Sequence, residues 1–249
     1  MIPLSQITDF LEEWAPLETA ADWDNVGLQI GHKDTLVHSV LLSIDVDSAV
    51  LNTLSRHPSN LVITHHPLFF KPLKRIQTAS DIGKILKTFL LKGIQLYSMH
   101  TNLDAAVDGV NDCLVRHYGF DPSGQDTVAG AFGKIITGPN LSFFELKKRL
   151  PCQILGNKAP KSIQKLAFCC GSGHGLLQQC FEKEVDCIIT GEISYHDEVF
   201  CEMNGITVIA LGHKESELFI LDKIKEKLES QFPTLRITLS TGQALYKHH

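Results

Sequence analysis

Several features that would assign the chain to a particular class of protein are missing from its sequence. No apolar run approaches the ~20 residues that a helix needs to cross a bilayer. The first residues, MIPLSQITDFLEEW, lack the positively charged region and the apolar stretch of a secretory signal peptide. We therefore expect a soluble protein of the cytoplasm that has no membrane partner.

The chain also lacks an excess of positive charge. Its 23 lysines and arginines are outnumbered by 28 acidic residues, which gives a formal net charge of −5. This balance argues against nucleic acid or an anionic membrane as the main partner. The basic cluster Lys71, Lys74 and Arg75 is a local exception that could steer a phosphorylated small molecule, although a solvated loop is the simpler interpretation.

Paired cysteines are absent as well. The number of cysteines, seven, is odd, no two of them have the CxxC spacing, and several lie inside apolar runs such as LAFCC and DCIIT. These positions favour small buried apolar side chains in a reducing compartment over a disulfide framework or a thiolate zinc site. The cysteines are Cys113, Cys152, Cys169, Cys170, Cys180, Cys187 and Cys201.

What the sequence does contain is an alternation of short apolar runs with amphipathic, helix-like segments. Hydrophobic residues make up 43% of the chain, which is enough for a sizeable core. Six runs are rich in β-branched or large apolar residues without strict alternation, which is typical of strands covered on both faces. They are SVLLSI (39–44), LVIT (61–64), IQLYSM (94–99), KLAFCC (165–170), DCIIT (186–190) and ITVIAL (206–211).

Periodic patterns between these runs predict seven helices. They cover Ser5–Trp14, Asp81–Leu91, Asp108–His117, Ser142–Leu150, Leu176–Lys183, Ser194–Met203 and Ser216–Leu228. The alternation of strands and helices predicts an α/β fold with mostly parallel or mixed sheets and helices on both faces. We expect one domain over residues 1–249, with two α/β subdomains around a central cleft. The glycine-rich stretch of roughly Asp121–Gly138 favours a boundary there, which gives approximate subdomains 1–125 with 206–249, and 126–205.

Polar side chains follow four of the predicted strands at the point where each strand ends. LVIT leads into His65-His66-Pro67, IQLYSM into HTNLD (100–104), DCIIT into GEISYHD (191–197), and ITVIAL into GHKESE (212–217). Ligands of open α/β sheets bind beyond the carboxyl ends of the strands. These four ends therefore predict one convergent site that would lie in the cleft.

A mixture of imidazole and carboxylate side chains suits zinc, iron or manganese. Neighbouring residues of an extended strand point to opposite sides, so His65 and His66 can serve one site if the backbone turns there, or if each binds a different ion. For an isolated pair, a buried structural histidine beside an exposed one would be the better interpretation. The three other polar strand ends favour a metal site instead.

His213 and Glu217 are four residues apart and would share one face of a helix, where the carboxylate could bridge two cations. Glu215 would face elsewhere. Asp104 and Asp108 compete as a further ligand; Asp104 is closer to the strand end, whereas Asp108 could cap or charge a helix N-terminus.

His100 is then a candidate for proton transfer or for supporting a ligand, and so is Glu192. His196 and Asp197 could form a carboxylate–imidazole pair, or the segment could simply be the polar start of a helix that Ser194 caps. The turn Gly171–Gly175 could present backbone N–H groups to a phosphate, and a plain tight turn explains it equally well.

Taken together, these motifs resemble the NIF-three-like family, whose members are often named GTP cyclohydrolase I type 2 homologues. The resemblance extends in order over WDNVGLQIG (23–31), ITHHPLFF (63–70), SMHTNLDAAVDGVND (98–112), GSGHG (171–175), DCIITGEISYHD (186–197) and GHKESE (212–217). It implies five metal ligands, which here are His65, His66, Asp104, His213 and Glu217, with the glutamate bridging two divalent metal ions. It also implies a homohexameric ring.

The resulting hypothesis is a dinuclear metal-dependent hydrolase in which metal-activated water attacks a nucleotide-like substrate. The family name implies a guanine nucleotide whose imidazole-ring carbon is released as formate. The alternatives are a phosphoesterase, or a metal-binding or scaffold protein without catalytic activity.

Overall fold

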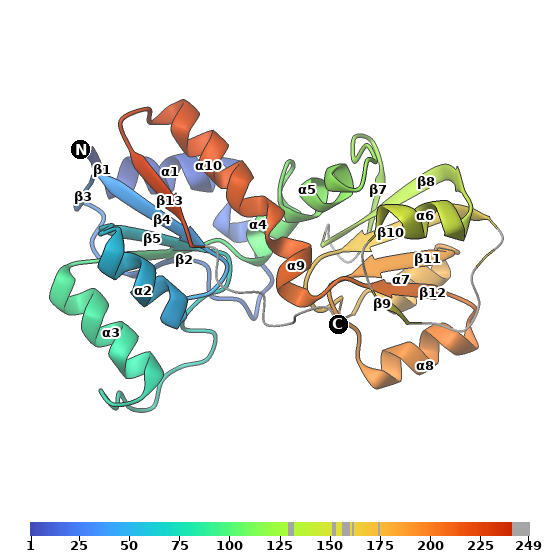
Figure 1. The fold of residues 1–249 in the computed structure, drawn as a ribbon, viewed down its shortest axis with the longest axis horizontal. Coiled ribbons are helices and arrows are strands. Elements are labelled where there is room, and N and C mark those ends of the chain that lie inside the picture. Colours follow the sequence, from blue (N-terminus) through green and yellow to red (C-terminus); the bar gives the residue numbers. More distant parts are fainter. Residues whose placement is uncertain (129–131, 151–152, 156–159, 161, 174, 241–249) are drawn as a thin grey trace. The chain divides into compact units, whose positions relative to one another are not determined.

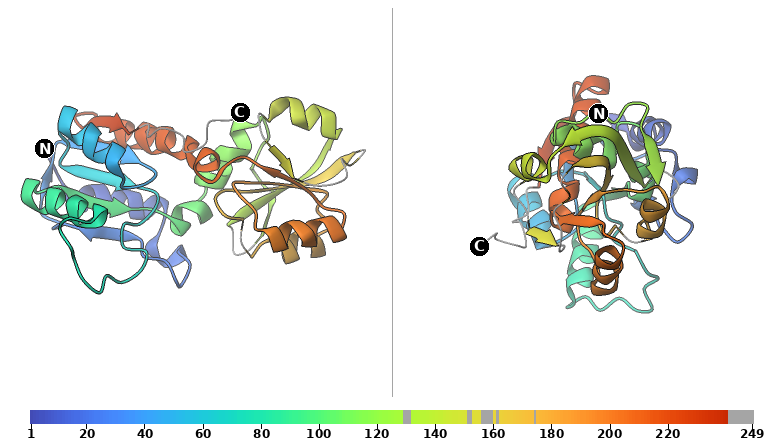
Figure 2. Two further views of the ribbon diagram at one scale, coloured as in Figure 1. Left: turned by 60° about the horizontal axis from the view of Figure 1, so that its bottom comes forward. Right: turned by 90° about the vertical axis from the view of Figure 1, so that its right-hand side faces the viewer.

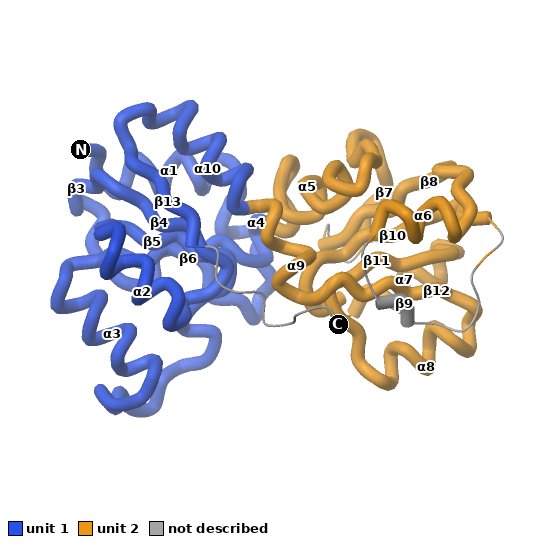
Figure 3. Tube along the Cα trace, viewed as in Figure 1, with its two compact units in different colours: residues 1–103, 221–245 blue, residues 104–220, 246–249 orange. Residues whose placement is uncertain are grey.

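The computed structural model describes residues 1–128, 132–150, 153–155, 160, 162–173 and 175–240 (Figure 1). The chain divides into two compact units (Figure 3). The described part of the first unit is 1–103 with 221–240, and that of the second lies between 104 and 220. None of the helices in the described residues is long and apolar enough to span a bilayer.

The first unit is built on a five-stranded sheet with the strand order β13-β4-β5-β6-β2. The first four strands are parallel and β2 is an antiparallel edge strand. The strands are β2 (Gly27–Ile30), β4 (Ser39–Ser43), β5 (Leu61–Thr64), β6 (Gln95–Ser98) and β13 (Arg236–Leu239). A separate pair joins β1 (Ile2–Pro3) to β3 (Leu36–Val37).

Helices cover both faces of this sheet (Figures 1 and 2). On one face, Leu41, Val62 and Leu96 from the strands form a core cluster with side chains of α2 (Ser48–Arg56) and α3 (Asp81–Lys92). On the other face lie α1 (Leu4–Trp14) and α10 (Phe219–Gln231), and Tyr97 of β6 donates a 3.1 Å hydrogen bond to Glu12 of α1. The two short helices η1 (Leu17–Thr19) and α4 (Thr101–Ala105) complete the elements of this part of the chain.

Local sequence sets the ends of α3. The Ser80 hydroxyl accepts a hydrogen bond from the Gly83 N–H at 3.2 Å and so satisfies one of the free donors of the first turn. At the other end Gly93 adopts a left-handed conformation with φ 62°, which ends the helix and turns the chain into β6.

The second unit is built on a six-stranded sheet with the strand order β7-β8-β10-β11-β12-β9. The three central strands, β10, β11 and β12, are parallel, and β7, β8 and β9 run antiparallel to their neighbours. The strands are β7 (Asp126–Val128), β8 (Gly133–Leu141), β9 (Gln153–Leu155), β10 (Ile163–Cys169), β11 (Cys187–Thr190) and β12 (Thr207–Ala210).

The faces of this second sheet are also covered by helices. The helices α7 (Leu177–Glu182) and α8 (Tyr195–Met203) contribute Cys180 and Cys201 to a core cluster with Ala167, Ile188 and Val208. Figure 2 shows α6 (Phe143–Arg149) on the opposite side of the sheet from α8. The remaining helices are α5 (Val110–His117) and α9 (His213–Glu217).

The structure confirms the α/β fold class and all six predicted strands, each within two residues at either end. The mixed character of the sheets comes from four antiparallel strands that were not predicted, β2, β7, β8 and β9, and the parallel strand β13 was not predicted either. Six predicted helices are present, but the seventh segment, Ser216–Leu228, is divided between α9 and α10. The helix α2 was not predicted.

The two units divide the chain at other positions than expected. The stretch Asp121–Gly138 contains β7 and the first part of β8, which pair antiparallel in the second sheet, and it does not separate the units. Residues 206–220 belong to the second unit because β12 pairs with β11 in that sheet. The units change at 103/104 and at 220/221.

Neighbouring residues of α3 provide a test of the first core. Phe89 is fully buried and Leu90 is 67% exposed. We expect Phe89→Ala to lower the free energy of unfolding by about 3–5 kcal/mol, because it removes a large buried side chain. Leu90→Ala, the matched control, should change it by less than about 0.5 kcal/mol. Urea denaturation followed by circular dichroism measures both; similar losses would contradict this packing.

Candidate metal centre

Three histidines gather beyond the carboxyl ends of two neighbouring parallel strands in the first unit. His65 and His66 follow β5, and His100 follows β6. The ring centroids are 5.1 to 5.3 Å apart. Each histidine offers one ring nitrogen, and these atoms lie within 4.8 Å of one another, a spacing at which they could hold a metal ion.

The adjacent residues His65 and His66 can turn toward one place because the strand ends there. The backbone bends at both residues, and the Thr64 hydroxyl donates a 2.8 Å hydrogen bond to the carbonyl oxygen of His66. The sequence left open whether the backbone turns at this pair, and the structure has the turn.

Each of the three imidazoles is oriented by an acceptor on its Nδ1 side. His65 bonds to the carbonyl oxygen of Met99 at 2.8 Å, and His66 bonds to Asp45 Oδ1 at 2.7 Å. His100 bonds to Asp24 Oδ1 at 2.9 Å. A carbonyl or carboxylate oxygen can only accept, so Nδ1 carries a proton in each ring, and a metal ion would bind through Nε2. This is the arrangement usual for histidine ligands of metals.

Asp24 accepts hydrogen bonds from His100 and from Thr101. Burial raises its pKa, but hydrogen bonds from His100 and from the Thr101 hydroxyl and N–H outweigh burial and lower the pKa from 3.8 to about 2. Asp24 therefore stays ionised at neutral pH and fixes the orientation of the His100 ring.

Asp24 and Asp45 were not among the predicted site residues. Asp45 could have been found, because it follows β4 in the same way that the histidines follow β5. Asp24 precedes β2 and lies 76 positions from His100, so no strand end indicated it. The block WDNVGLQIG was its only signal in the sequence.

A second group of polar side chains lies in the second unit. The imidazole of His213, at the start of α9, lies between two carboxylates: Nδ1 is 3.0 Å from Glu192 Oε1, and Nε2 is 3.4 Å from Glu217 Oε1. Glu217 is 2% exposed. The four-residue spacing on a helix therefore places His213 and Glu217 together, and Glu215 lies elsewhere, against Gly212.

Cys170 forms a hydrogen bond with Asp104, the other predicted ligand of this unit. The Cys170 thiol donates a 3.3 Å hydrogen bond to Asp104 Oδ1. Asn111 bonds to the Asp104 carbonyl oxygen and accepts from the Cys170 N–H, at 3.2 and 3.0 Å. The competing Asp108 forms a 2.6 Å ion pair with Arg116, which accounts for its charge without a metal.

The cysteines behave as buried thiols. Burial and the nearby Asp104 carboxylate raise the pKa values of Cys169 and Cys170 well above the ordinary value of 9.0. Five of the six cysteines in the described residues are buried. Cys152 lies outside the described residues. Neither of the candidate metal-binding groups within the described residues includes a cysteine.

The turn that begins at Gly171 is shaped by the carboxylate and imidazole beside it. A Cβ at Gly171, whose φ is +63°, would lie 2.6 Å from Glu217 Oε1 and 3.3 Å from His213 Nε2. The Gly171 N–H donates to Ser216 at 2.9 Å, so it is occupied within the protein. These contacts favour the tight-turn interpretation for Gly171; the turn also includes His174, which lies outside the described residues.

The start of α8 agrees with the capping interpretation of its polar residues. The Ser194 hydroxyl accepts a hydrogen bond from the Asp197 N–H and donates one to the Asp197 carboxylate, at 3.3 and 2.7 Å. His196 is exposed, and its ring contacts Tyr195. Asp197 thus takes part in capping the N-terminus of α8.

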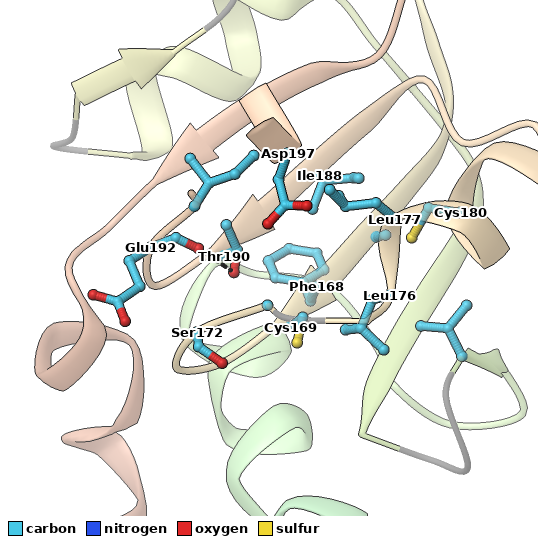
Figure 4. Close-up of a pocket in the computed structure, with 14 residues that line it drawn as sticks. Phe168, Cys169, Ser172, Leu176, Leu177, Cys180, Ile188, Thr190, Glu192 and Asp197 are labelled. Carbon is cyan, nitrogen blue, oxygen red and sulfur yellow. Dashed lines mark hydrogen bonds between the residues drawn. The ribbon is translucent and has the colours of Figure 1, made fainter. Parts of the chain in front are cut away.

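A small pocket opens beside this second group (Figure 4). Its lining is mostly apolar and includes Cys169, Leu176, Leu177 and Ile188. Glu192 lies at its edge, and Figure 4 shows the carboxylate of this residue pointing away from the apolar lining. The Oε1 atom of Glu192 forms a 3.0 Å hydrogen bond with Nδ1 of His213.

Comparisons with known proteins match nearly the whole chain. A family model described as Duf34/NIF3 (NGG1p interacting factor 3) matches residues 2–244. The "GTP cyclohydrolase 1 type 2 homolog" of Campylobacter jejuni is 32% identical, over 98% of this chain and 99% of that protein. The "GTP cyclohydrolase 1 type 2" of Helicobacter pylori strain J99 is 30% identical, over 87% and 88%. "NIF3-like protein 1" of Drosophila melanogaster is 32% identical, over 86% and 77%.

Solved structures share the fold. A Bacillus cereus protein related to NIF3 matches with a TM-score of 0.87 at 19% identity, over 100% of this chain and 99% of that chain. Reduced HcgD from Methanocaldococcus jannaschii matches with a TM-score of 0.86 at 27% identity, over 97% and 98%.

The low pKa of Asp24 predicts a dependence of stability on pH. Because its folded pKa of about 2 lies below 3.8, the carboxylate stabilises the fold above about pH 4, and this contribution is lost as the pH falls toward 2. We expect Asp24→Asn to be less stable than the parent protein by about 2 kcal/mol at about pH 6, and the difference to shrink at about pH 2.5. Urea denaturation at both pH values measures it; a difference independent of pH would contradict this role.

A comparison of alanine substitutions at two glycines of one turn distinguishes the effect of backbone strain from the effect of contact with Glu217. Gly171 and Gly175 both have positive φ, but a Cβ at Gly175 would meet nothing within 4 Å. We expect Gly171→Ala to be less stable than Gly175→Ala by about 1–3 kcal/mol, because only the former displaces the carboxylate. Thermal denaturation of both variants measures this, and equal losses would show that Glu217 has room to move.

Proposed function

Because the chain belongs to the Duf34/NIF3 family, we propose that it binds two divalent metal ions and hydrolyses a small, nucleotide-like molecule. The arrangement of the three histidines is the observation that carries this proposal. Their Nδ1 atoms are engaged by fixed acceptors, and one ring nitrogen of each histidine lies within 4.8 Å of those of the other two.

The proposed ligands are His65 and His66 of the first unit and Asp104, His213 and Glu217 of the second. The set is two carboxylates and three imidazoles, which fits zinc, iron or manganese. Glu217 is the proposed bridging ligand. Its burial supports this role, because a buried carboxylate is stabilised by positive charge.

A bound divalent ion would supply Lewis acidity and would make water more acidic, which is the chemistry that hydrolysis at neutral pH requires. Five protein ligands are fewer than two ions usually take, so positions remain for water and substrate.

The neighbouring residues would then orient the ligands and move protons. Asp45 fixes the ring of His66, and Glu192 fixes the ring of His213 through Nδ1. His100, whose Nδ1 is held by the ionised Asp24, lies with its ring 5.1 and 5.3 Å from the rings of His65 and His66 and is our candidate for proton transfer. Glu192 is a second candidate.

The substrate class comes from the names of the relatives. "GTP cyclohydrolase 1 type 2" names a guanine nucleotide and a reaction that opens a ring by hydrolysis. In such a reaction the imidazole-ring carbon of guanine would leave as formate. We also propose that the chain assembles into a homohexamer in the cytoplasm, as the family resemblance implies.

Metal content tests the ligand set directly. We expect about two ions per chain after gentle purification, and a loss of at least one in His66→Ala and in Glu217→Gln. Elemental analysis with circular dichroism measures metal and folding together. His57→Ala changes an exposed histidine outside the cluster and serves as the control. Well under one ion per chain in the parent protein, unchanged by Glu217→Gln, would remove the site.

Turnover separates the hydrolase from its alternatives. Metal-loaded protein should release formate from GTP, and His100→Ala should lower kcat more than it lowers metal content. Release of phosphate without formate would favour a phosphoesterase. Release of neither product from a broad panel of nucleotides, with metal retained, would favour a metal-binding or scaffold protein.

A further inference from the structure

Two large aromatic side chains lie on the surface of the first unit, directly beside the histidine cluster. Trp23 is 61% exposed and Phe70 is 49% exposed, and their ring centroids are 5.6 Å apart. Both rings also border His100, with centroids 5.9 and 6.4 Å from it. Single exposed apolar residues need no explanation, but two that contact each other beside a polar cluster mark a binding surface.

The backbone on both sides of this pair is fixed although the rings are exposed. Asp24, next to Trp23, bonds to His100 and Thr101. The Asn25 side chain donates a 2.8 Å hydrogen bond to the carbonyl oxygen of Phe69, next to Phe70. These hydrogen bonds connect the two loops. The two rings therefore lie on a surface whose backbone loses little conformational entropy when a ligand binds.

Positive charge follows the aromatic pair along the chain. Lys71, Lys74 and Arg75 are all exposed and lie in the loop of residues 65–80 that joins β5 to α3. Long irregular loops inside compact domains are commonly binding loops. The unit thus presents aromatic rings next to the histidines and three cations on the same loop as Phe70.

We propose that Trp23 and Phe70 stack on the planar base of a phosphorylated nucleoside and that Lys71, Lys74 and Arg75 bind its phosphates. The identification of this ligand as the substrate rests on the proposed function. Stacking on aromatic rings accepts any base, and lysine and arginine bind phosphate groups. The two parts of the surface match the two parts of a nucleotide, and the base would lie against the histidine cluster.

Tryptophan fluorescence can report on this surface without turnover. The chain has two tryptophans, and the other, Trp14, lies under Lys227 on the face formed by α1 and α10. In a Trp14→Phe protein the emission therefore comes from Trp23. We expect GTP and ATP to quench it saturably, and inorganic tripolyphosphate to leave the emission unchanged but to compete with GTP.

Substitutions then assign the two parts of the ligand. Phe70→Ala should raise the Kd of both GTP and guanosine about tenfold, the size expected from loss of base stacking. Phe144→Ala, at a phenylalanine that is 66% exposed in the second unit, is the control. Replacing Lys71, Lys74 and Arg75 by Gln should weaken GTP about tenfold but leave guanosine unchanged. The same charge change at Lys84, Lys87 and Lys92 of the neighbouring α3 is its control.

Other outcomes would overturn the proposal. Absence of saturable quenching by millimolar GTP would exclude stacking, and so would quenching that Phe70→Ala leaves unchanged. A changed sedimentation coefficient of folded Trp23→Ala would assign the surface to contact with a second copy of the chain. Binding without formate release would refute the proposed hydrolysis alone, whereas formate release with an unchanged KM in Trp23→Ala would refute the stacking surface alone.

Discussion

The hydrogen-bond ladder between parallel strands continues past their last apolar residues, and the candidate centre depends on this continuation. His65 and His66 donate from their N–H groups to the carbonyls of Ser43 and Ile44, at 3.2 and 2.8 Å. In the second unit Glu192 donates to Gly171, and Gly212 to Gly191, at 2.9 and 2.8 Å. The sheet thus fixes the backbone of each functional segment, and the positions of the side chains on that backbone are fixed with it.

This constraint explains how much of the molecule the sequence reveals. The six predicted strands include every parallel strand except β13, because strands covered on both faces form continuous apolar runs. The antiparallel strands β2, β7, β8 and β9 have less regular patterns, and their partners are set by tertiary structure. The helix α2 was missed because its apolar residues, of which Val50 and Leu54 are buried, are few and its polar residues many.

The candidate site residues also differ in whether the sequence alone could identify them. The strand-end rule found the histidines of the first unit and both carboxylates that contact His213. It also applies to Asp45, which was overlooked. Asp24 could not be found in this way, because its partnership with His100 connects segments 76 residues apart. The sequence favoured Asp104 over Asp108 through its position near the strand end and the family resemblance, whereas their contacts with Cys170 and Arg116 are ones that no spacing encodes.

The glycines of the second unit also limit which sequences can maintain this centre. A Cβ would lie 2.6 Å from Glu217 at position 171, 2.4 Å from Thr190 at position 173, and 2.3 Å from the Gly171 carbonyl oxygen at position 191. Side chains at the first two could shift, but the backbone at the third cannot. Among these three glycines, position 191 should therefore tolerate any other amino acid least, although residue 191 carries no reactive group.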